Sequence, residues 1–156
     1  MVAIPRGAFV LLKEILRHVL KRPVVGVAVV ARDDRGRFLL IRRADTGTWA
    51  LPGGTLEWGE PIRRCIVREL REETNAEPTS EPELLGVYSD PSRDPRFHAV
   101  TVLVSCRVRA DVPGAQNPLE IREAKFFDDA SLPAEMAMGM NDMLDVARSK
   151  NAPYLE

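Results

Sequence analysis

The chain has 156 residues, of which 45% are hydrophobic and 29% charged, with a formal net charge of −1 at pH 7. This length corresponds to about one domain with a buried core, and the near-neutral charge excludes a general attraction to nucleic acid. No apolar run approaches the ~20 residues that span a membrane, so we expect a cytoplasmic protein. The two cysteines, Cys65 and Cys106, have apolar neighbours and are expected to be buried free thiols.

The first 22 residues form a separate segment with a basic, amphipathic pattern. Its apolar residues recur at helical spacing and are Phe9, Leu12, Leu16, Val19 and Leu20. Such a helix can touch a membrane surface, but it more often packs on its own domain or on a second subunit. We therefore predict a packing or dimerisation helix over 1–22, a main domain over 23–156, and a homodimer as one possible assembly. His18, within this helix, is expected to be structural.

The remainder alternates between strand and helix patterns, which is typical of an α/β fold. Apolar and β-branched runs predict strands at 24–31, 37–43, 84–89, 99–108 and 123–127. Asp33-Asp34-Arg35-Gly36 has the composition of a hairpin turn between the first two strands. A Met- and Ala-rich helix is predicted from Pro133 to about Lys150, and its methionines are expected to fill the core or an interface.

Three carboxylates stand within five residues, at Glu69, Glu72 and Glu73, on a predicted helix. Pro61 fits the first helical position, and Asn75 fits the left-handed residue past the end. At about 100° per residue, the acids continue an apolar stripe made by Ile62, Cys65, Ile66 and Leu70. A solvated charge run would lie opposite that stripe, so we expect the acids to face the protein body. Unpaired buried carboxylates are costly, and Arg partners or a hard cation such as Mg²⁺ would offset the cost.

This segment resembles the Nudix box, G-x5-E-x7-R-E-U-x-E-E-x-G-U, where U is an apolar residue. The matching residues are Gly54, Glu60, Arg68, Glu69, Leu70, Glu72, Glu73 and Ala76. Asn75 stands where the pattern has its second glycine, and Asn accepts a left-handed conformation better than most residues. The resemblance covers roughly residues 23 to 134. It implies a Nudix-type α/β/α sandwich with a mixed central sheet, in which the box forms a loop–helix–loop.

The resemblance also implies roles for the residues of the box. Members of this family hydrolyse a nucleoside diphosphate linked to another group, and divalent metals neutralise the phosphate charge and activate water. Glu69, Glu72 and Glu73 are then the ligands of Mg²⁺, with Mn²⁺ as a possible replacement, and the backbone at Gly54 completes the coordination. Glu60 and Arg68 are expected to pair and to orient the helix.

A further acid from a loop often supplies a metal ligand or general base in this family. Glu120 is our candidate, and Glu123 is the alternative.

Substrate recognition is predicted for the loop 89–98, which reads Ser-Asp-Pro-Ser-Arg-Asp-Pro-Arg-Phe-His. Prolines lower the cost of ordering a loop, and arginine suits bidentate phosphate recognition. Pro91 lies fifteen residues beyond Ala76, an offset that is associated with the ADP-ribose pyrophosphatases of the family. The candidate substrate-binding residues are Arg43, Trp49, Pro91, Arg93, Arg96 and His98. The alternatives are a rigid loop whose charges pair among themselves and, for Trp49, packing instead of base stacking.

These patterns predict a Mg²⁺-dependent hydrolase that splits ADP-ribose, or a related nucleotide sugar, into AMP and a sugar phosphate. Its partner is therefore a small nucleotide, not a nucleic acid. Rival enzymes are a triphosphatase for oxidised nucleotides and a dinucleoside polyphosphate hydrolase. A catalytically silent domain that binds a nucleotide as a regulator is the non-enzymatic alternative, but it would be expected to lose acids of the box, and this chain has all of them.

Overall fold

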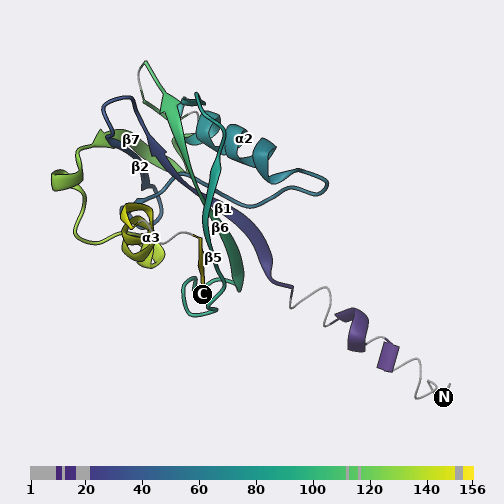
Figure 1. Cartoon of the computed structure of the whole chain (residues 1–156). Helices are drawn as coiled ribbons and strands as arrows, with labels where there is room; N and C mark the ends of the chain where they lie inside the picture. The colour runs from purple at the N-terminus through teal and green to yellow at the C-terminus, as the bar shows by residue number, and fades with distance from the viewer. Residues whose placement is uncertain (1–9, 12, 17–21, 112, 116, 150–152) are drawn as a thin grey trace.

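The computed structural model describes residues 10–11, 13–16, 22–111, 113–115, 117–149 and 153–156. In the N-terminal segment, 10–11 and 13–16 are helical, and Figure 1 shows this short helix apart from the main domain. Its apolar side chains Val10, Leu11 and Ile15 are exposed. Packing on the domain and dimerisation both stay predictions for the segment 1–22, most of which lies outside the described residues. His18 lies outside the described residues.

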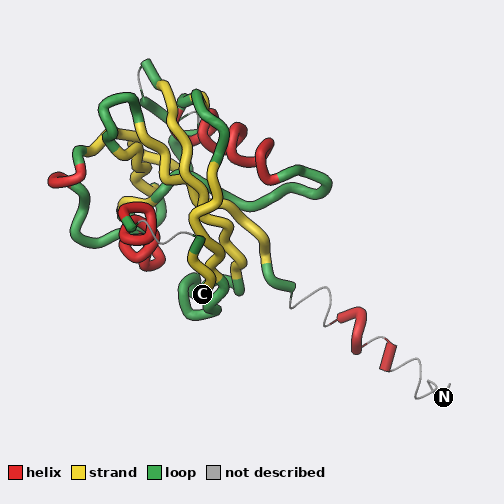
Figure 2. Tube along the Cα trace, viewed as in Figure 1, coloured by secondary structure: helices red, strands yellow, loops and turns green. Residues whose placement is uncertain are grey.

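A mixed sheet is the centre of the domain (Figures 1 and 2), and eight strands are found in the part of the chain that the structure describes. The strands are β1 (Val24–Arg32), β2 (Phe38–Arg43), β3 (Trp49–Ala50), β4 (Glu77–Pro78), β5 (Glu83–Tyr88), β6 (Ala99–Arg109), β7 (Ile121–Phe127) and β8 (Tyr154–Leu155). The main order is β3-β2-β1-β6-β5-β8, with β7 paired to β2 and β4 to β6. The long β1 and β6 run parallel, and β2 is antiparallel to both β1 and β7.

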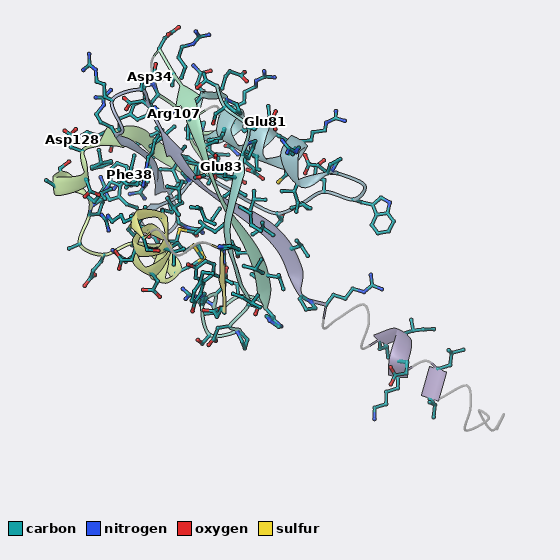
Figure 3. The ribbon with its side chains drawn as sticks, viewed as in Figure 1. Asp34, Phe38, Glu81, Glu83, Arg107 and Asp128 are labelled. Carbon is teal, nitrogen blue, oxygen red and sulfur yellow. The ribbon has the colours of Figure 1, made fainter. Side chains whose placement is uncertain are left out.

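Helices cover both faces of this sheet. Helix α2 (Ile62–Thr74) packs on one face, where Ile66 and Leu70 meet the β1 side chains Val27 and Val29. Helix α3 (Met140–Arg148) packs on the other, with a core cluster that contains Phe38, which is labelled in Figure 3. Successive strand residues point to opposite faces, so the continuous apolar run of β1 supplies both layers. The expected α/β/α sandwich with a mixed sheet is confirmed.

The end of α2 agrees with the sequence-based prediction, whereas the first residues of α2 and α3 differ from it. Asn75 follows α2 in a left-handed conformation, with φ of 56°, as its residue type predicts. Pro61 was predicted to be the first helical residue, but it is the N-cap residue, and α2 begins one position later, at Ile62. Helix α3 begins at Met140 instead of Pro133, because Met138 and Gly139 have φ of 54° and 65°. Left-handed residues end the regular helical path, so only a short 3₁₀ turn, Ala137–Gly139, precedes α3.

Both cysteines are buried and free, as expected. Burial raises the pKa of Cys65 to about 12 and that of Cys106 to about 11, so neither thiol is a reactive thiolate at neutral pH. Within the described residues, no helix combines the length and apolar character that a membrane crossing requires.

Candidate active site

Two glycines bring the start of the box against strand β1. The segment before α2 runs beside β1, where the Val27 N–H donates to the Gly54 carbonyl at 2.8 Å. A Cβ on Gly53 would lie 2.1 Å from the Val27 carbonyl oxygen, and the φ of Gly53 is +151°. A Cβ on Gly54 would lie 2.2 Å from Oε1 of Glu69. Gly53 therefore needs to be glycine, because its Cβ would meet backbone and its φ is positive, and the close approach at Gly54 sets an acid of α2 directly against this backbone.

Arg68 ties helix α2 to the loop that precedes it. Its Nε and Nη2 each donate to one carboxylate oxygen of Glu60, both at 2.9 Å, and Nη2 also donates to the Thr55 carbonyl at 3.2 Å. The Glu60 side chain is only 7% exposed. The Arg68 hydrogen bonds lower the pKa of Glu60 to about 2. The structure thus brings Glu60 and Arg68 together as a bidentate pair, the geometry that best fixes orientation.

The three acids of the box occupy different environments. Glu69 is 8% exposed and accepts a hydrogen bond from Arg68 Nη1 at 2.9 Å. Burial raises the pKa of Glu69, and Arg68 opposes that shift. Burial also raises the pKa of Glu73, to about 8, although its Oε2 accepts from the Gly53 N–H at 2.8 Å. The Glu72 side chain is 52% exposed. Glu69 and Glu73 therefore face the protein body as expected, whereas Glu72 lies at the solvent rim.

A cleft of about 580 Å³ opens beside these acids. It gathers five acids and three arginines, which are Asp45, Glu69, Glu72, Glu73, Glu120, Arg43, Arg68 and Arg96. The negative charge of Glu120 contributes to the raised pKa of Glu73, so this loop acid is electrostatically coupled to the box. Glu123 lies on β7 opposite Arg42 and is not among the residues that line the cleft.

The acids of the cleft fit a divalent cation by their chemistry. Carboxylate oxygens are the ligands that Mg²⁺ and Mn²⁺ prefer. Within the described residues, no group of three or more His, Cys, Asp or Glu side chains is arranged to hold a metal ion, and Arg68 and the Gly53 N–H donate to oxygens of Glu69 and Glu73. Burial nevertheless disfavours the charged forms of both acids, and a nearby positive charge offsets that penalty.

Two predicted phosphate-binding arginines line the cleft, each paired with a neighbouring aspartate. Arg43 donates to both oxygens of Asp45, at 2.9 and 2.6 Å. Arg96 donates to both oxygens of the buried Asp94, at 2.9 and 2.7 Å. These pairs fix the guanidinium planes at the edge of the cleft, where anionic groups of a substrate would enter.

The other predicted substrate-binding residues lie elsewhere. Arg93 lines a smaller cavity of about 150 Å³ that adjoins the cleft. Trp49 packs edge-on against Phe127, with ring centroids 4.7 Å apart. Pro91 and His98 are exposed and are not among the lining residues of either cavity, although His98 Nε2 lies 2.9 Å from the Ser89 carbonyl and so closes the loop 89–98.

Phe97 is a lining residue that the sequence analysis did not select. It contributes to both the cleft and the smaller cavity and is 37% exposed. An aromatic ring at a ligand site offers a flat surface for stacking. Phe97 stands among the charged residues of the loop 89–98. An aromatic residue in that position was the signal from which a lining residue could have been predicted.

Comparisons with known proteins agree with this geometry. The family model of the NUDIX domain matches residues 22–146. The ADP-ribose pyrophosphatase of Methanocaldococcus jannaschii is 40% identical over 116 residues, which are 71% of this chain and 65% of that protein. The chain therefore spans slightly less than two thirds of the length of this relative.

Solved structures show the same fold. The MutT NUDIX hydrolase from Burkholderia pseudomallei has a TM-score of 0.69 at 27% identity, covering 80% of this chain and 98% of that chain. The NUDIX domain of Shewanella oneidensis NrtR, complexed with ADP ribose, has a TM-score of 0.73 at 23% identity, covering 93% and 97%. At that identity the likeness is one of fold alone. Together with the match over residues 22–146, these findings establish that the chain belongs to the NUDIX domain family.

Proposed function

We propose that this protein hydrolyses the pyrophosphate bond of a nucleoside diphosphate derivative, with ADP-ribose as the first candidate, in a reaction that depends on Mg²⁺ or Mn²⁺. The observation that carries the proposal is the cleft itself. The buried Glu69 and the partly buried Glu73, whose charged forms are disfavoured, lie beside arginines that are fixed at its edge. A diphosphate accompanied by a cation complements this arrangement of charges.

The acids of the cleft have separate roles in this proposal. Glu69, Glu72 and Glu73 hold the cation, which when bound neutralises phosphate oxygens and lowers the pKa of a water. Arg68 orients Glu69 through their hydrogen bond of 2.9 Å. Glu120, at the exposed side of the cleft, takes the proton of the attacking water as general base.

In this proposal, the arginines of the cleft and Phe97 bind the substrate. Arg43 and Arg96 face the diphosphate, each held in place by its aspartate. Phe97 lies where the cleft meets the smaller, largely apolar cavity, so a base or ribose attached to the diphosphate would contact its ring. ADP-ribose is the first candidate because the relative from M. jannaschii, at 40% identity, is an ADP-ribose pyrophosphatase.

A substrate panel with Mg²⁺ tests this function. It contains ADP-ribose, other nucleoside diphosphate sugars, diadenosine polyphosphates and nucleoside triphosphates, and the products are resolved by chromatography. We expect ADP-ribose to yield AMP and ribose 5-phosphate. Turnover of triphosphates alone would overturn the choice of substrate, and no turnover of any compound would overturn the enzymatic role in favour of a nucleotide-binding regulator.

A further inference from the structure

The C-terminal strand β8 lies beside the strand that leads into the loop 89–98. It pairs in parallel with β5, with Gly86 opposite Tyr154 and Val87 opposite Leu155. The Glu156 N–H continues this pairing by donating to the Val87 carbonyl at 3.0 Å. A segment more than sixty residues away in the sequence thus places Glu156 at the beginning of the loop.

The Glu156 side chain accepts three hydrogen bonds from this loop and forms an ion pair with Arg93. Its Oε2 accepts from the N–H groups of Ser89 and Asp90, at 2.7 and 2.6 Å. Its Oε1 lies 2.8 Å from Nε and 2.7 Å from Nη2 of Arg93. Arg93 lowers the pKa of Glu156, and the side chain is 19% exposed. Charge-assisted hydrogen bonds of this kind are the strong ones in proteins.

The Arg93 guanidinium contacts two carboxylates and an aromatic ring. Besides Glu156 it donates to Oδ2 of Asp142 at 3.2 Å, and its Cζ lies 4.7 Å from the centroid of the Tyr88 ring. Tyr154 of β8 contacts the same ring, with centroids 5.2 Å apart. Tyr88 is buried and lines the smaller cavity. Arg93 is therefore committed to two carboxylates and a ring, which leaves it poorly placed to bind a phosphate.

We propose that Glu156 is a positioning residue for the substrate site, acting through Arg93 and the start of the loop 89–98. By fixing Ser89, Asp90 and Arg93, it sets the path of the chain that carries Arg96 and Phe97 to the cleft. The kinetic part of this inference rests on the proposed function. Positioning of binding groups acts on substrate affinity more than on the chemical step when the metal ligands are untouched.

The test is Glu156→Gln, which keeps the size of the side chain and removes its charge. Its control is Glu135→Gln, which removes an exposed carboxylate outside both cavities. For Glu156→Gln we expect KM for ADP-ribose to rise about five- to tenfold, with kcat within about twofold of the parent protein, and no change for Glu135→Gln. An unchanged KM overturns the proposal, and so does a fall in kcat with KM unchanged.

A second measurement separates this inference from the proposed function. Amide hydrogen exchange of the protein without substrate is compared for the parent chain and Glu156→Gln. We expect faster exchange in the loop 89–98, with α2 and β1 unchanged. Unchanged protection of the loop overturns the positioning role whether or not ADP-ribose is hydrolysed, and faster exchange throughout the domain overturns it in favour of a general folding role. Absence of turnover in the parent chain overturns only the proposed function.

Discussion

At the scale of single residues, the site depends on two acids that face the protein body, the buried Glu69 and the partly buried Glu73. Glu69 and Glu73 each have one strong hydrogen-bond donor, Arg68 and the Gly53 N–H respectively, and burial still raises both pKa values. The sequence could predict this burial, because the acids continue the apolar stripe of α2. It could not predict that Glu72 is at the rim, because a helical wheel gives direction but not the position of solvent.

The metal-free protein should lose stability as the pH rises. The pKa of Glu73 is about 8 in the folded chain, above the ordinary value of 4.5. Between these pH values the folded state binds more protons than the unfolded state. The stability that Glu73 contributes is therefore complete below about pH 4.5 and is lost as the pH rises through about pH 8. We expect the Tm in EDTA to fall over this window and the fall to be smaller in Glu73→Gln. A Tm in EDTA that shows the same pH dependence in both proteins would contradict the expectation.

Glu72→Gln should separate activity from stability. The side chain is 52% exposed, so we expect a change in Tm of no more than about 2 °C, because exposed substitutions have small effects on stability. We expect kcat with Mg²⁺ to fall at least about 100-fold, since metal stabilisation of the transition state amounts to several kcal/mol. Glu57→Gln, an exposed acid outside the cleft, is the matched control. Activity that survives in Glu72→Gln would remove Glu72 from the set of ligands.

At the scale of elements, the long regular segments were predictable and the short ones were not. The sequence patterns were sufficient to predict β1 and β6, from their apolar runs, and α2, from its periodicity and its capping residue. Strands β3, β4 and β8 have two residues each, too few for any periodicity. They are strands because they pair with neighbouring strands of the sheet. The predicted start of α3 was wrong because Met138 adopts a left-handed conformation, and methionine is not a residue type that signals such a break in a helix. The contact of Glu156 with Arg93 likewise arises from the β5–β8 pairing, which leaves no local pattern.

The segment that connects β3 to α2 contains two adjacent glycines for which we expect different outcomes. In Gly53→Ala the new Cβ meets backbone at 2.1 Å and the residue keeps φ of +151°, so we expect a loss of about 2 kcal/mol or more in unfolding free energy. In Gly54→Ala the Cβ meets the Glu69 carboxylate at 2.2 Å, and a side chain can move away. We expect Gly54→Ala to lose activity with a smaller loss of stability. Urea unfolding and turnover of both variants check this, and equal losses of stability would contradict it.

At the scale of the whole molecule, the described residues of the N-terminal segment expose apolar side chains. Val10, Leu11 and Leu16 are 59%, 63% and 48% exposed, and exposed apolar groups on one helix favour association. We predict that the segment 1–22 mediates a homodimer. Deleting 1–22 should halve the mass measured by sedimentation equilibrium while kcat changes less than about twofold. A full-length chain that sediments as a monomer would contradict this assembly.

We propose that the cleft between α2 and the loop 89–98 hydrolyses a pyrophosphate with the acids of the box. The most direct measurement is the time course of AMP formation from ADP-ribose by the full chain, with Mg²⁺ and with EDTA, beside Glu72→Gln. We expect equal amounts of AMP and ribose 5-phosphate with Mg²⁺, and formation of AMP near the uncatalysed rate with EDTA or in Glu72→Gln. AMP formation at the same rate in all three conditions, or none with Mg²⁺, would contradict it.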